Sequence, residues 1–197
     1  MNCSQERFIS DLVCKLKDLS FEDPQGPKTD RLNNEIADVA YNHKLCVWAK
    51  GLKDCKNPDN KAHISGHEWL YDLICFTYDE DEHYALNNTI MVMESEWKGK
   101  RNSAKGHDGN DPYGEVKYDF QKLLISNADI KLMVYLQHKE DKTYESLTQY
   151  FKKRIDNYHQ GRESDIFLFV RYSHKKQGKR ECLISSYTKS NGWEDLH

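Results

Sequence analysis

A chain of 197 residues suits one compact domain, and we expect residues 1–197 to form a single domain with a sizeable core. Charged residues make up 31% of the chain, and no apolar run approaches the ~20 residues of a membrane-spanning helix, which argues against a membrane protein. The formal net charge of -3 argues against non-specific coating of nucleic acid, although separate basic loops can still contact phosphates.

The N-terminus and the cysteines bear on location. No basic segment leads into an apolar one near the N-terminus, so a secretory signal is not expected. The six cysteines form no CxxC pair and resemble reduced thiols, which favours a cytoplasmic protein.

The first part of the chain carries apolar residues at helical spacing. Phe8, Leu12 and Leu16 predict an amphipathic helix over residues 5–20. A similar pattern predicts a second helix over residues 30–50, with Asp30 as its N-cap and Gly51 at its end.

The remainder alternates strands with helices. After a polar loop at residues 54–66, apolar runs predict strands at 68–78 and 88–97, a helix at 115–127, a strand at 130–136, a helix at 141–159, and strands at 166–172 and 182–187. Hairpin-joined strands combined with helical crossovers predict an α/β sandwich with a central mixed sheet flanked by helices.

Three carboxylates interrupt the two central strands. Glu94 and Glu96 share one face at the end of the second strand, and Asp72 lies in the otherwise apolar run at the first. Like charges beside an apolar surface are costly to desolvate unless a cation lies between them. The pattern predicts a divalent-metal site, the alternative being a partly exposed hairpin whose carboxylates face water.

The spacing of these acids resembles the PD-(D/E)XK nuclease superfamily, in the variant that has Glu in place of the last motif lysine. The resemblance rests on Asp72, on Glu94-Ser95-Glu96, and on the helical segment from Tyr118 to Leu124, and it extends over roughly residues 33–136. Two positions depart from the family pattern: Tyr71 stands where the motif has Pro, and Glu96 where most members have Lys.

The resemblance implies a restriction-endonuclease-like fold and a DNA endonuclease that leaves 5′-phosphate and 3′-hydroxyl ends. Its core of helix, three-strand meander, helix and strand falls on residues 30–136 if one more strand lies before Asp72 or within the hairpin. The alternatives are a catalytically inactive nucleic-acid-binding domain or a protein-interaction domain of the same fold.

Oxygen ligands suit Mg²⁺ or Mn²⁺, so we expect Asp72 and Glu94 to bind the metal and Glu96 to bind a second metal or accept a proton. The resemblance adds Glu35 as a further acidic group, for which surface solvation is the alternative. Lys122 either serves as a migrated catalytic lysine or pairs with Asp119 at i, i+3. We expect Glu96 to fill the role of the motif lysine.

Basic loops supply the expected contacts to nucleic acid, with double-stranded DNA as the preferred partner and a homodimer as one candidate assembly. The first loop carries Lys98, Lys100, Arg101 and Lys105 directly after the acidic strand. A second basic loop spans residues 174–180. Solvated surface is the alternative for both loops.

Overall fold

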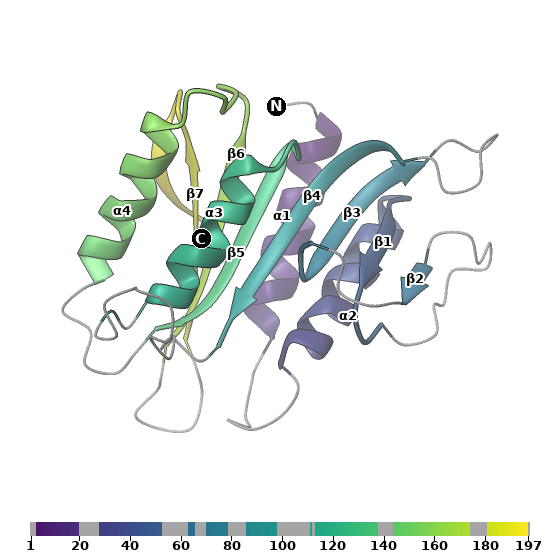
Figure 1. The fold of residues 1–197 in the computed structure, drawn as a ribbon. Helices are drawn as coiled ribbons and strands as arrows, with labels where there is room; N and C mark the ends of the chain where they lie inside the picture. Colours follow the sequence, from purple (N-terminus) through teal and green to yellow (C-terminus); the bar gives the residue numbers. More distant parts are fainter. Residues whose placement is uncertain are drawn as a thin grey trace.

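The computed structural model describes residues 3–19, 28–52, 63–65, 70–78, 86–97, 111, 113–137, 144–173 and 181–196. Within these residues the chain forms four helices and eight strands (Figure 1). The helices are α1 (Cys3–Asp18), α2 (Lys28–Asn42), α3 (Gly114–Ile125) and α4 (Tyr144–Asn157). The strands are β1 (Cys46–Ala49), β2 (His63–Ser65), β3 (Leu73–Tyr78), β4 (Leu86–Glu96), β5 (Ile130–Gln137), β6 (Ile166–Ser173), β7 (Cys182–Thr188) and β8 (Gly192–Leu196).

All the described strands join one sheet in the order β2-β1-β3-β4-β5-β6-β7-β8. The neighbours β4, β5 and β6 run parallel, whereas β1, β3 and β4 alternate in direction, as do β6, β7 and β8. Helical crossovers join β4 to β5 through α3 and β5 to β6 through α4, and the short strand β2 runs parallel to β1 at the sheet edge. The predicted α/β architecture with a mixed sheet flanked by helices is therefore confirmed.

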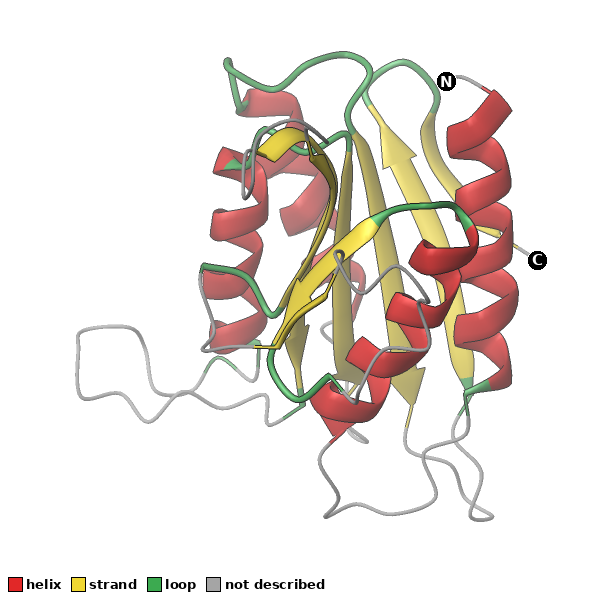
Figure 2. Cartoon of the chain, turned by 90° about the vertical axis from the view of Figure 1, so that its right-hand side faces the viewer, coloured by secondary structure: helices red, strands yellow, loops and turns green. Residues whose placement is uncertain are grey.

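The helices form two layers on opposite faces of this sheet. Helices α1 and α2 pack on one face, where Met91 and Met93 of β4 join their apolar residues, while Val92 of β4 faces α3 and α4. Figure 2 shows the sheet between these two helical layers. Side-chain alternation thus assigns the even-numbered residues of β4 to the α3 side. No helix in the described part of the chain is long and apolar enough to cross a membrane.

The predicted helix over residues 30–50 is wrong in its second half, because α2 ends at Asn42 and residues 46–49 form β1. The amide of Leu45 donates to the carbonyl of Ala40, and the amide of Lys44 donates to the carbonyl of Tyr41. This is a Schellman end, in which Lys44 adopts a positive φ of 58°. Glycine usually takes that position, so the sequence carried no clear stop signal.

Strand β1 lies before Asp72 and pairs antiparallel with β3. It completes an order of helix, three antiparallel strands, helix and parallel strand over α2, β1, β3, β4, α3 and β5. The short strands β2 and β8 are additions at the two sheet edges that the sequence analysis did not predict. The arrangement brings the start of β3 beside the end of β4, where the three central carboxylates lie.

Candidate metal site

The antiparallel register of β3 and β4 brings Asp72 to the end of β4. Leu73 pairs with Met93, so the residue before Leu73 reaches the level of Glu94 and Ser95. The Oδ2 atom of Asp72 accepts hydrogen bonds from the backbone amide of Ser95 at 2.8 Å and from its hydroxyl at 2.7 Å. Asp72 is thereby held against β4 in a fixed orientation.

Helix α2 supports this arrangement from the opposite face of the sheet. The hydroxyl groups of Ser95 and Thr29 lie 3.0 Å apart, and the indole of Trp97 donates to Thr29 at 3.0 Å. The fully buried Asn33 donates from Nδ2 to the carbonyl of Lys50 at 3.1 Å and, at 3.4 Å, to the carbonyl of Asp72. The backbone around Asp72 is consequently fixed from two sides.

Glu94 points to the other face, where α3 covers it, and its side chain is 2% exposed. The Nζ atom of Lys122 lies 2.8 Å from Oε1 of Glu94 and 3.0 Å from Oδ1 of Asp119. The contact with Glu94 is an ion pair, and Oε1 of Glu94 accepts no hydrogen bond from the described residues. Lys122 therefore pairs with Asp119 and also contacts the acidic strand, and its catalytic role stays a prediction.

The electrostatics of this cluster favour a cation. Burial raises the pKa of Glu94 to about 8, with Asp72 and Asp119 adding to the rise and Lys122 opposing it. Burial acts to lower the pKa of Lys122, but contact with Glu94 and Asp119 outweighs it and raises that pKa. The ammonium group of Lys122 thus faces two carboxyl groups, of which that of Glu94 is buried.

Tyr71, which occupies the position of the motif proline, also belongs to this cluster. Its hydroxyl donates to the backbone carbonyl of Lys122 at 3.4 Å, which ties the start of β3 to α3. Burial and the neighbouring Glu94 raise the pKa of its phenol, so the hydroxyl keeps its proton.

Of the other predicted site residues, Glu96 lies near Glu94, Glu35 lies in the opposite helical layer, and the basic loops are not described by the structure. Glu96 is half-buried on the same face as Glu94, about 7 Å further along the strand. Glu35 pairs with Lys15 of α1 at 2.6 Å, an interaction between the two helices of the opposite layer. The basic residues Lys98, Lys100, Arg101 and Lys105, and the basic loop at 174–180, lie outside the described residues.

We tested whether the side chains at the end of β4 fit a divalent metal. Among the described residues no group of three or more His, Cys, Asp or Glu side chains is arranged to hold an ion. Mg²⁺ needs fewer protein ligands, because it keeps several waters and uses one or two carboxylates together with substrate phosphate. Asp72 and Glu94 supply that number of carboxylates, and Asp72 lies close enough to Glu94 to add to the rise of its pKa, of which burial is the larger cause.

The sequence analysis missed several members of the cluster. Ser95, Thr29 and Asn33 act through hydrogen bonds that join residues up to 66 positions apart, and single-sequence patterns carry no signal for such pairs. Asp119 was available from its i, i+3 spacing to Lys122, but its place beside Glu94 depends on how α3 packs.

Comparison of the chain with protein-family models, with curated proteins and with solved structures gave no match. The fold and the chemistry at the end of β4 are therefore the basis for a functional assignment.

Proposed function

We propose that this protein is a metal-dependent nuclease that hydrolyses phosphodiester bonds in nucleic acid, with DNA as the preferred substrate. The observation that carries the proposal is the convergence of Asp72, Glu94 and Lys122 from two strands and a helix at the carboxyl end of β4. Ligands of open α/β sheets characteristically bind outside the carboxyl ends of the strands.

The order of α2, β1, β3, β4, α3 and β5 supports the same proposal. The resemblance implies a core in this order, and here Asp72 directly precedes the second strand of the meander and Glu94 lies near the end of the third. Glu96 and Lys122 both face the site, so either can take the role of the motif lysine. The contact between Lys122 and Glu94 favours the lysine.

In this mechanism Asp72 and Glu94 would hold Mg²⁺ or Mn²⁺, which supplies Lewis acidity and lowers the pKa of a bound water. Ser95 keeps Asp72 oriented through two hydrogen bonds. Lys122 balances Glu94 before substrate arrives and then places its ammonium beside the scissile phosphate, where negative charge develops. Glu96 would accept a proton from the attacking water.

One observation favours the alternative of an inactive nucleic-acid-binding or protein-interaction domain. Lys122 already neutralises Glu94 in the structure, which is also how a site that has lost its metal would be stabilised. The two proposals differ in whether a divalent ion displaces the ammonium from Glu94.

The test is incubation of the purified protein with plasmid, linear duplex, single-stranded DNA and RNA, each with Mg²⁺, Mn²⁺ or EDTA. We expect cleavage that needs metal and disappears in Asp72→Asn, while Asp38→Asn, the same change at an exposed position of α2, keeps full activity. Metal-independent cleavage, or equal activity in both variants, would contradict the proposal. Binding of nucleic acid without any cleavage would instead support the inactive domain.

A further inference from the structure

A cavity of about 530 Å³ lies between α4 and strands β5 to β8, apart from the carboxylate cluster. Its wall includes Tyr135 of β5, Thr148 of α4, Arg171 of β6 and Trp193 of β8, with Lys17 of α1 at one side. Arg171 and Tyr135 both lie in the second halves of their strands, so the cavity opens at the same end of the sheet as the metal site.

The strand register connects this cavity to the candidate metal site. Glu96 of β4 pairs with Tyr135 of β5, and Tyr135 pairs with Arg171 of β6. Residues paired in adjacent strands share a face, and adjacent strands lie about 4.8 Å apart, so Glu96 and Arg171 are about 10 Å apart along one row. A strand of nucleic acid that places a phosphate at Glu94 therefore continues toward Arg171.

The cationic side chains of the cavity suit a phosphate. Arg171 is half-buried with its Nε atom fully covered, and a guanidinium group binds phosphate oxygens in a bidentate manner. Lys17 lines the cavity from α1 and lies close enough to Cys182, which pairs with Tyr172, to lower the pKa of that thiol against the stronger effect of burial. Asp195, which is exposed in the same wall, opposes an anion and so limits its affinity.

Other groups in the wall suit a nucleobase. Trp193 is partly exposed and stacks on Phe169, with ring centroids 4.9 Å apart and an angle of 18° between the rings. An indole held in this way is a platform for base stacking. The hydroxyl of Thr148 is buried without a hydrogen-bond partner among the described residues, and buried polar groups normally have one.

We infer that this cavity binds a nucleotide unit of the substrate strand next to the cleaved bond, with its phosphate on Arg171 and its base against Trp193. The inference rests on the proposed function, since it makes the cavity an extension of the same nuclease site. It assigns these residues to binding and positioning, separate from the metal chemistry.

The test measures binding of the 5′-phosphorylated dinucleotide pTpT to the full chain in EDTA, by calorimetry and by tryptophan fluorescence. Without metal there is no cleavage, so the readout is independent of catalysis. We expect Arg171→Gln to weaken binding at least tenfold, Arg171→Lys to retain part of the affinity, and Asp195→Asn to tighten binding. Trp193→Phe should remove most of the fluorescence change. Lys153→Gln, the same loss of charge at an exposed position of α4, is the matched control and should bind like the parent.

The outcomes separate this inference from the proposed nuclease activity. If the parent fails to bind pTpT, or if Arg171→Gln binds it like the parent, the inference is overturned even when metal-dependent cleavage is present. If binding depends on Arg171 but no metal supports cleavage of any substrate, the nucleotide site stands and the nuclease proposal fails.

Discussion

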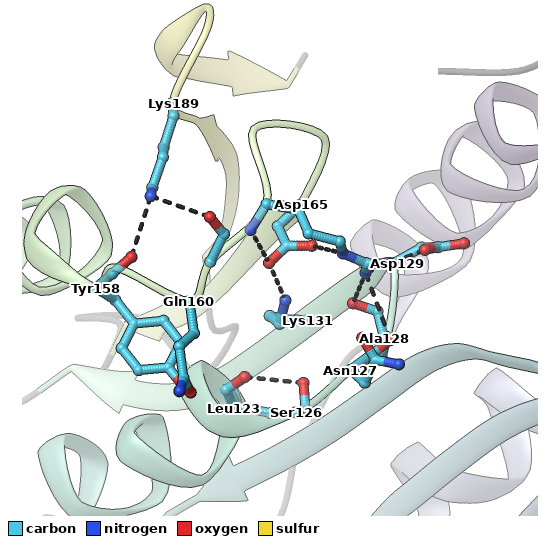
Figure 3. Close-up of polar contacts among 12 residues, drawn as sticks. Leu123, Ser126, Asn127, Ala128, Asp129, Lys131, Tyr158, Gln160, Asp165 and Lys189 are labelled. Atoms are coloured by element: carbon cyan, nitrogen blue, oxygen red, sulfur yellow. Dashed lines mark hydrogen bonds and ion pairs between the residues drawn. The ribbon is translucent and has the colours of Figure 1, made fainter.

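Two buried pairs of a carboxylate and a lysine lie at opposite ends of the parallel strands, and they differ in charge balance. At the amino ends of β5 and β6, Lys131 donates to Asp165, and both side chains are almost fully buried (Figure 3). Arg162 donates to the other oxygen of Asp165 at 2.7 Å and lies 3.1 Å from Asp129. Two acids therefore meet two bases.

At the carboxyl end of β4, the described contacts join one lysine to two acids. Lys122 pairs with Glu94 and Asp119, and Asp72 lies close enough to Glu94 to add to the rise of its pKa to about 8, of which burial is the larger cause. At the amino ends, burial lowers the pKa of Lys131 even though Asp165 opposes this change. A network whose acids are matched by bases stabilises the fold, whereas a buried carboxyl group with a raised pKa is costly to ionise, and a bound cation would offset that cost. The comparison favours the end of β4 as the place of the proposed site.

The largest expected effect is the loss of cleavage when Glu94, at the carboxyl end of β4, is changed. Glu94→Gln removes a metal ligand, so we expect cleavage to fall by about a thousandfold or more, which is about 4 kcal/mol of transition-state stabilisation. Stability at pH 8 should stay the same or increase, because a buried charge is lost. The measurement is single-turnover cleavage together with thermal unfolding. Glu163→Gln, an exposed site, is the control, and a Glu94→Gln variant that cleaves like it would refute the assignment.

A change in the pair of Lys131 and Asp165 should instead lower the stability of the fold. Asp165→Ala leaves Lys131 buried without its acid, which we expect to cost about 3–5 kcal/mol in the free energy of unfolding. Asp129→Ala, whose carboxylate is 25% exposed, should cost about 1 kcal/mol or less. Combining Lys131→Met with Asp165→Asn should recover much of the loss, because it removes both charges.

Urea unfolding checks this prediction. If Asp165→Ala is no less stable than Asp129→Ala, the Lys131 network does not stabilise the fold, and the contrast with the end of β4 disappears. If the folded Asp165→Ala variant instead loses cleavage without losing stability, the amino ends of the strands belong to the functional site.

A smaller effect ranks the two candidates for the role of the motif lysine. Lys122 is 2.8 Å from Glu94, so we expect Lys122→Gln to lower the single-turnover rate about a hundredfold at saturating Mg²⁺. The sequence analysis expected Glu96 to matter more, and Glu96→Gln is the direct comparison. Lys117→Gln, one turn earlier on α3 and paired with Asp111, controls for the loss of a helical cation. A larger loss in Glu96→Gln would restore the original ranking.

Comparison of sequence with structure shows which inferences needed tertiary packing. Periodicity was sufficient for α1, for α3 and for the strands β4 and β5, because each has a long, regular apolar pattern. The strand β1 was hidden because its four residues follow a helix that ends without glycine. The buried Lys131 was also hidden, since nothing in the local pattern distinguishes it from a lysine that reaches solvent.

In the candidate site, too, some features follow from the local sequence pattern and others depend on tertiary packing. Alternation along β4 was enough to place Glu94 and Glu96 on one face, and the antiparallel pairing of β3 with β4 was expected. The hydrogen bonds of Asp72 to Ser95 and the approach of Lys122 to Glu94 depend on register and on helix packing. These are long-range features, which a single sequence does not specify.

The smallest effect concerns pH and follows from the raised pKa of Glu94. In the folded, metal-free protein Glu94 keeps its proton up to about pH 8, whereas in the unfolded chain it ionises near its ordinary pKa of 4.5. Between these values the folded state binds more protons, so its stability falls as pH rises, by up to about 1.4 kcal/mol per pH unit. Urea unfolding in EDTA across this range should show a steeper decline for the parent than for Glu94→Gln. Added Mg²⁺ should flatten the decline, because a cation at Glu94 favours its ionised form. Equal slopes for parent and variant in EDTA would show that Glu94 is ionised throughout, and the proposed cation at the end of β4 would then lose this support.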